Sequence, residues 1–143
     1  MNFAAELIAD LRTLEAAEQS LRNIPEELAM LEYQFETIEA SQTDRVIVSG
    51  GFCDREAALV ANIEKRETLS KNLEMTKIKV EMIKRALSTL TDTEREVIRR
   101  FFIRSERGAV YSLMDALGYE RTQIYKIRNI AVKKLLRALY GEA

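Results

Sequence analysis

The sequence predicts an all-α protein, with a long antiparallel, coiled-coil-like helical hairpin over residues 1–88 and a smaller helical domain over residues 89–143. Three observations support this prediction. The 143 residues include only one proline and five glycines. Leu, Ala, Glu, Lys and Arg, which favour helices, are abundant. Apolar residues also recur at heptad spacing. Together these features argue against a β-sandwich, a β-barrel or a βαβ fold.

Two nearly continuous helices are expected at the start of the chain, over residues 3–24 and 25–40. Pro25 separates them, because proline lacks a backbone donor and clashes with the preceding turn, so that it kinks a helix or begins a new one. The apolar seam is Leu7, Leu11, Leu14 and Leu21 before the proline, and Leu28, Leu31, Phe35 and Ile38 after it.

Residues 41–53 interrupt the helical period and are expected to form a loop. The segment contains turn-forming residues and the pair Gly50-Gly51, and its apolar stretch Val46–Val48 is too short for an independent strand. The lone Cys53 is expected to be a small apolar filler.

A second long helix is expected over residues 54–88, with Asp54 as its cap. Its seam comprises Leu59, Asn62, Arg66, Leu69, Leu73, Thr76, Val80, Ile83, Leu87 and Leu90. Residues 3–40 and 54–88 have similar reach, on the order of 50 Å at about 1.5 Å per residue, which favours an antiparallel hairpin. Since two helices alone rarely bury enough apolar surface, we expect the hairpin to form homo-oligomers; the alternative is a simple spacer.

Three shorter helices are expected to follow, over about residues 91–103, 110–117 and 120–139. Thr91 and Glu94 have the spacing of a capping box at the start of the first. Gly118 is expected to end the second in a left-handed conformation. Two helices joined by so short a turn cross steeply, as in a helix-turn-helix. The contacts are expected to involve Leu113, Leu117, Tyr119, Ile124 and Ile127.

Charge is distributed unevenly along the chain. Residues 1–87 carry 11 Lys and Arg against 16 Asp and Glu, whereas residues 88–143 carry 11 against 7. The first part therefore has a net charge of −5 and the second of +4. Such asymmetry predicts that the second domain meets a polyanion.

The face of the last helix that points away from the apolar contacts carries residue types that bind double-stranded DNA. Its members are Arg121, Thr122, Gln123, Tyr125, Lys126, Arg128 and Asn129. Contacts with the DNA backbone are expected from Gln123, Arg128, Lys133, Lys134, Arg137 and Arg99. The alternative is an ordinary helical hairpin with a solvated basic face, in which Lys133 and Lys134 only complement the helix dipole.

The stretch LTDTEREVIRRFFI…VYSLMDALGYERTQIYKIRNIAVKKLLRAL resembles region 4 of the sigma-70 superfamily, the domain that reads the −35 promoter element. The matching positions are Leu90, Glu94 to Val97, Leu117, Gly118, Arg121, Ile124, Ile127, Ala131, Lys133, Lys134 and Leu135. By this resemblance, the base-reading side chains are Arg121, Thr122, Tyr125 and Lys126. The chain departs from the family at Glu120, where Ser or Thr is usual, and at Met114, where Ala is usual.

The chain from about residue 25 to 140 also resembles small phage-encoded regulators of the RinA/ArpU type, which join a helical hairpin with a V-x-G-G loop to a region-4-like domain. Here that loop is Val48-Ser49-Gly50-Gly51. The resemblance implies a phage or prophage transcriptional activator that acts with RNA polymerase. Nothing in residues 1–88 resembles the helix with which sigma factors melt the −10 element, so we do not expect the chain to open promoters alone.

Other classes of protein are disfavoured by composition. With no histidine and one cysteine, the chain lacks the residues for a His-based active site or a structural zinc ion, so we expect no enzyme, metal or cofactor. No apolar run approaches the roughly 20 residues needed to span a bilayer, and the first ten residues lack a signal-like stretch, which predicts a soluble, cytoplasmic protein with no membrane partner. Two alternatives remain open: a phage small terminase-like DNA-packaging subunit, and a polymerase- or sigma-binding module that does not bind DNA.

Overall fold

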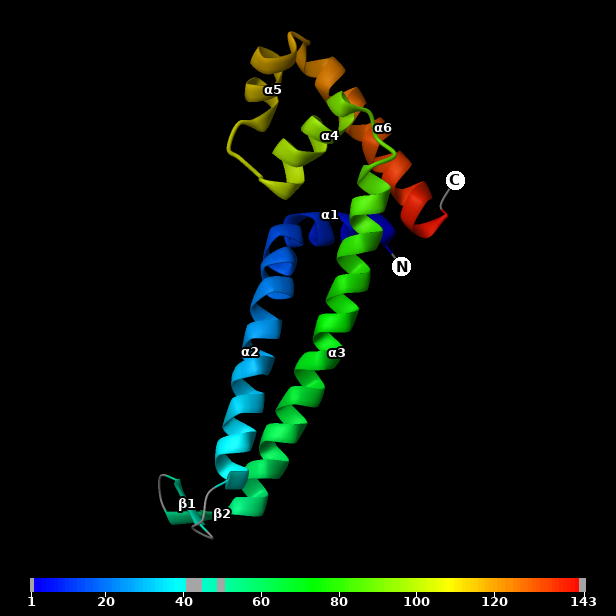
Figure 1. Cartoon of the computed structure of the whole chain (residues 1–143). Coiled ribbons are helices and arrows are strands. Elements are labelled where there is room, and N and C mark those ends of the chain that lie inside the picture. The colour runs from blue at the N-terminus through cyan, green and yellow to red at the C-terminus, as the bar shows by residue number, and fades with distance from the viewer. Residues whose placement is uncertain (1, 41–44, 49–50, 142–143) are drawn as a thin grey trace. The chain divides into compact units, whose positions relative to one another are not determined.

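The computed structural model describes residues 2–40, 45–48 and 51–141, and its elements, apart from one short π-helix, are labelled in Figure 1. They are α1 (Phe3–Arg12), α2 (Leu14–Ala40), β1 (Arg45–Val48), β2 (Gly51–Asp54), α3 (Arg55–Leu87), α4 (Asp92–Ile98), the π-helix η1 (Arg99–Ile103), α5 (Ala109–Leu117) and α6 (Arg121–Tyr140). The predicted all-α class is confirmed. The chain divides into two units, residues 19–77 and residues 1–18 with 78–143, and not at the expected boundary between residues 88 and 89.

The first helix break lies at Thr13 and not at Pro25, so the expected helices 3–24 and 25–40 were wrong in their boundary. The Thr13 hydroxyl donates to the Ala9 carbonyl at 3.0 Å, and α2 then continues through Pro25 to Ala40. Pro25 therefore lies inside a helix of 27 residues, whose remaining turns keep their helical conformation on both sides of it. In α1, Leu7 and Leu11 are fully buried within the unit that contains the C-terminal helices.

Within the unit of residues 19–77, α2 and α3 run side by side in opposite directions (Figure 1). A polar layer crosses their seam. The Asn62 amide is buried and donates to the Leu31 carbonyl at 2.8 Å, while its oxygen accepts from Arg66 Nε at 2.9 Å. The Arg66 guanidinium in turn lies 4.8 Å from the centre of the Phe35 ring. The two polar seam positions predicted from sequence are therefore satisfied by neighbours on both helices.

A short antiparallel ladder, β1 with β2, lies in the segment expected to be a loop over residues 41–53. Val46 is paired with Cys53 and Val48 with Gly51. The stretch Val46–Val48 is too short for an independent strand but is extended because residues 51–54 supply a partner. Residues 41–44 and 49–50, and every side chain from 41 to 54, Cys53 included, lie outside the described part of the chain.

The C-terminal helices are packed around an apolar core. Val97 of α4, Val110 and Leu113 of α5, and Ile124 of α6 form its buried centre. At the start of α4 the predicted capping box is confirmed: the Thr91 hydroxyl accepts from the Glu94 amide, and the Glu94 carboxylate accepts from the Thr91 amide at 2.9 Å. The expected helix 91–103 becomes a π-helix at η1, where the Arg104 amide donates to the Arg99 carbonyl five residues earlier.

Candidate nucleic-acid interface

The α5–α6 pair is joined by a short connection that starts at Gly118. This glycine has φ of +72° and closes α5 with a hydrogen bond from its amide to the Met114 carbonyl, as the sequence predicted. Leu113 and Ile124 are fully buried between the helices. Tyr119, which was expected to contribute to the contacts between these helices, is instead 40% exposed.

One side of α6 packs into the core, and this determines which side is free. Ile124, Ala131 and Leu135 are fully buried, at spacings of seven and four residues that place them on one face. The opposite side is exposed, and we call it the α6 outer face. Its members are Thr122, Lys126, Asn129, Ile130, Lys133 and Arg137.

The α6 outer face is cationic and carries no acidic side chain, since α6 contains no Asp or Glu. Lys126, Lys133 and Arg137 are exposed, and none makes an ion pair with another residue of the described chain. Their positive charges are therefore turned toward solvent without an internal counter-charge. An uncompensated row of cations along a helix attracts an anionic polymer.

Lys134, predicted to contact a DNA backbone, has an internal partner. Its ammonium group lies 2.9 Å from Glu94 Oε1, the oxygen that also accepts the Thr91 amide. Burial disfavours the charged form of Glu94, which is 7% exposed, but these hydrogen bonds outweigh it and hold the pKa of Glu94 below its ordinary value. Lys134 thus ties α6 to the start of α4.

Arg99, the one predicted DNA-backbone contact outside α6, also has an internal partner. Its guanidinium donates two hydrogen bonds to Glu96, at 3.0 and 2.6 Å, and Arg100 donates a third at 2.6 Å. The Arg99 hydrogen bonds are the largest cause of a lowered pKa at Glu96; burial opposes them and Arg100 reinforces them. Arg100 also reaches Ser112 of α5 at 2.6 Å. This cluster fastens the α4–η1 segment to α5.

The predicted base-reading residues Arg121 and Tyr125 are stacked together at the flank of the outer face. The Tyr125 ring is half-buried and packs 6.0 Å from the Phe101 ring. Arg121 lies 5.6 Å from the centre of the Tyr125 ring, and Arg128 lies 4.8 Å from the same ring and 5.2 Å from that of Phe101. Cations over aromatic faces are attracted by the ring quadrupole, so these contacts favour the observed arrangement of the side chains.

Three other predicted DNA contacts are exposed, as the prediction requires. They are Thr122, Gln123 and Lys126.

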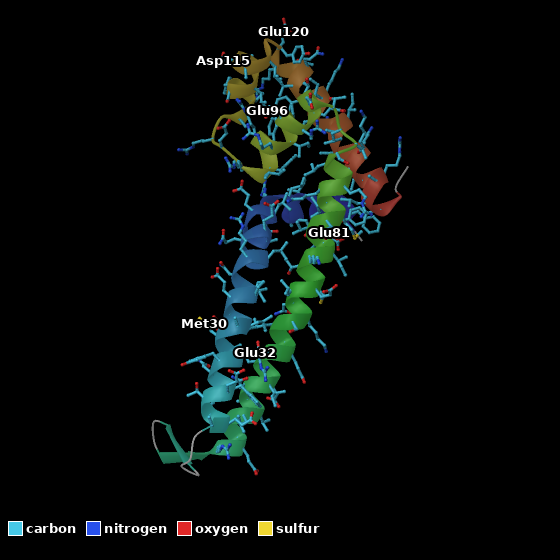
Figure 2. All side chains as sticks on the ribbon, in the orientation of Figure 1. Met30, Glu32, Glu81, Glu96, Asp115 and Glu120 are labelled. Carbon is cyan, nitrogen blue, oxygen red and sulfur yellow. The ribbon has the colours of Figure 1, made fainter. Side chains whose placement is uncertain are left out.

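Figure 2 labels Glu120 at the start of α6 and Asp115 on α5. Glu120 is the N-cap residue, yet its side chain makes no capping hydrogen bond. Met114, the second departure from the region-4 pattern, packs half-buried against the core cluster.

Two residues of the outer face were not assigned a role from sequence. The sequence predicts Asn129 as an exposed polar residue but not as a base reader, and it predicts no role for Ile130. Ile130 is 51% exposed, although an isoleucine in a helix ordinarily indicates the core. A helical-wheel projection centred on Ile124 and Ala131 would have placed Ile130 outside the core.

Comparisons of the chain with models of protein families, with curated proteins and with solved structures found no match. Among the described side chains, those of residues 2–40 and 55–141, no group of three or more Asp or Glu is placed to hold a metal ion. Over the same residues, no helix combines the length and apolar character that crossing a membrane requires.

Proposed function

We propose that the chain is a transcriptional regulator that binds double-stranded DNA through the α6 outer face. The observation that carries the proposal is the set of three exposed cations, Lys126, Lys133 and Arg137, on one face of a helix without acidic residues. These are point charges for phosphates, and their polar neighbours Thr122 and Asn129 are suited to base edges.

The dimensions of α6 suit the major groove. An α-helix with side chains is about as wide as that groove, roughly 12 Å. From Thr122 to Arg137 the helix rises by about 22 Å, so the face extends over several base pairs. In this arrangement Lys126, Lys133 and Arg137 lie against phosphates. Lys134 and Arg99 are left out of the proposed contacts because their charges already meet Glu94 and Glu96.

Contacts with the other helices hold the α6 outer face in a fixed position. The Glu94–Lys134 contact joins α6 to α4, and the Glu96–Arg100–Ser112 contacts join α4 to α5, so the three helices are connected to one another. A binding site on a helix fixed in this way is more precise than one on a loop.

The regulatory part of the proposal rests on the resemblance of residues 90–139 to sigma region 4. We extend it to an activator of phage or prophage genes that contacts RNA polymerase and assembles through its α2–α3 segment. Footprinting of the chain on the DNA around its own gene tests this extension. A protected site upstream of a promoter is the expected result, and protection nowhere in that region would contradict it.

The DNA-binding part is tested by the salt dependence of binding to duplex DNA, measured by fluorescence anisotropy. Lys133→Ala should weaken binding to all sequences alike and reduce the slope of log K against log salt by about 0.9, the effect of one phosphate contact. Lys71→Ala is the matched control, because Lys71 is an exposed lysine on α3.

A Lys133→Ala slope equal to that of the wild type would remove the phosphate assignment. No salt-sensitive binding to any duplex would overturn the proposal and favour a protein-binding module. Rings of eight or more subunits in light scattering would favour a DNA-packaging subunit instead.

A further inference from the structure

We infer that Asn129 and Ile130 make the α6 outer face a reader of A·T base pairs, with Asn129 at the adenine edge and Ile130 against the 5-methyl group of a thymine. The inference rests on the proposed function and deepens it, since it names the bases that the face selects. It also assigns a role to two residues that the resemblance to sigma region 4 leaves unused.

Ile130 is the first observation. It is 51% exposed, whereas Ile124 on the same helix is fully buried and Ile127 packs against the core. About half of the Ile130 side chain is therefore open to solvent, and along α6 it lies between the cations Lys126 and Lys133. In the major groove, the thymine 5-methyl group is the apolar feature of the base edges. An apolar side chain within a cationic, groove-facing surface fits that methyl group.

Asn129 is the second observation, and it is independent of the first. Its oxygen accepts a long 3.4 Å bond from Arg128, and its amide nitrogen has no partner among the described residues. A side-chain amide matches adenine in the major groove: the Asn129 nitrogen donates to N7, and its oxygen accepts from the N6 amino group. Asn129 would lose only the long hydrogen bond from Arg128 when it binds adenine, so little free energy is lost in the exchange.

The position of the two residues supports their joint role. Along α6 they lie between Lys126 and Lys133, about one helical turn from each. Lys126 and Lys133 are seven residues apart and lie on one line along the outer face, and Asn129 and Ile130 lie on the two flanks of that line within the same exposed surface. The phosphate contacts set the register, and Asn129 and Ile130 supply the discrimination.

The test starts from duplexes selected from a random pool by the full chain. Deoxyuridine in place of each thymine removes the 5-methyl group alone, and 7-deazaadenine in place of each adenine removes N7. One deoxyuridine substitution should weaken wild-type binding about fourfold, the effect of one buried methyl-sized group. It should have no effect on Ile130→Ala. Asn129→Ala should lose about 5- to 150-fold of the preference for A·T and become insensitive to 7-deazaadenine.

Two variants serve as matched controls. Ile78→Ala removes an isoleucine with the same 51% exposure on α3, and Asn72→Ala removes an exposed asparagine on the same helix. Both should keep the wild-type response to each modified base. Circular dichroism and affinity for a random duplex check that the α6 variants keep the fold and the phosphate contacts.

The outcomes separate this inference from the proposed function. Salt-sensitive binding with no selected A·T position would overturn the inference and leave DNA binding standing. The same would follow if deoxyuridine weakened the wild type and Ile130→Ala equally, or if Asn129→Ala kept its sensitivity to 7-deazaadenine. Absence of binding to any duplex would overturn both.

Discussion

The ammonium group of Lys134 lies 2.9 Å from the Glu94 carboxylate, which also caps α4 through the Thr91 amide. One buried carboxylate therefore serves as a helix cap and as the anchor of α6. This relationship assigns Lys134 to the fold, while its neighbour Lys133 is exposed and is left for a ligand.

Lys134→Ala should therefore affect stability more than DNA binding. We expect the free energy of unfolding to fall by about 1 kcal/mol. The variant removes a hydrogen bond to the charged, buried Glu94 carboxylate, but the Lys134 side chain itself is part-exposed, which limits the loss. The salt slope of DNA binding should stay close to that of the wild type, in contrast to Lys133→Ala. Urea unfolding and anisotropy titrations measure the two effects, and a slope reduced by about 0.9 with unchanged stability would reverse the two assignments.

Glu94→Gln tests the charge of the capping carboxylate through its pH dependence. Folding lowers the pKa of Glu94 below 4.5, so the ionised form stabilises the fold above that pH, and this contribution is lost as the pH falls through the lowered value. At pH 7 the variant should be less stable by about 1–2 kcal/mol, and the difference should shrink below pH 4.5.

Urea unfolding from pH 7 down to pH 3 measures this difference. Glu81→Gln, which alters an exposed carboxylate on α3, is the control (Figure 2). A Glu94→Gln difference that is constant across the range would show that the side-chain shape matters and the charge does not.

Asn62→Ala tests the polar layer between α2 and α3. The variant removes the donor to Leu31 and the acceptor of Arg66. Because the site is buried, we expect a loss of about 1–2 kcal/mol in the free energy of unfolding. Asn72→Ala, on the exposed side of α3, should change it by less than about 0.5 kcal/mol. Equal effects of the two variants would mean that the layer adds nothing to stability.

Gly118→Ala tests the turn between α5 and α6. No atom lies within 4 Å of a Cβ added at this position, so the cost comes from the φ of +72° alone. We expect a loss of about 1 kcal/mol on thermal or urea unfolding, and a smaller loss for Gly118→Asn, because asparagine tolerates the left-handed region better. Equal stability of Gly118→Ala and the wild type would show that the turn adopts another conformation.

The helical elements of the C-terminal part were largely predictable because their signals are local. The Thr91–Glu94 capping box and Gly118 act over three or four residues, and both are found as predicted. The π-helix η1 was not predictable, since its hydrogen bonds differ from those of an α-helix by one residue and leave no pattern in the sequence. The ladder β1–β2 was missed because neither four-residue strand is recognisable without its partner.

The candidate interface was predictable in type but not in detail. The excess of Lys and Arg after residue 88 indicated an anionic ligand, and spacing placed Lys126 and Lys133 on the last helix. The sequence alone does not show which cations have internal partners. Lys133 and Lys134 are adjacent, yet only the packing of α6 against α4 turns one toward Glu94 and the other toward solvent.

By itself, the sequence determined the helical class, the caps and the basic character of the last helix, because propensity, capping and charge are properties of short segments. The tertiary structure decided where the first helix breaks, which seam Leu7 and Leu11 join, and which face of α6 is free. These features depend on contacts between residues far apart in the chain. Burial of Ile124, Ala131 and Leu135 leaves Asn129 and Ile130 exposed, and this packing makes them candidates for reading DNA.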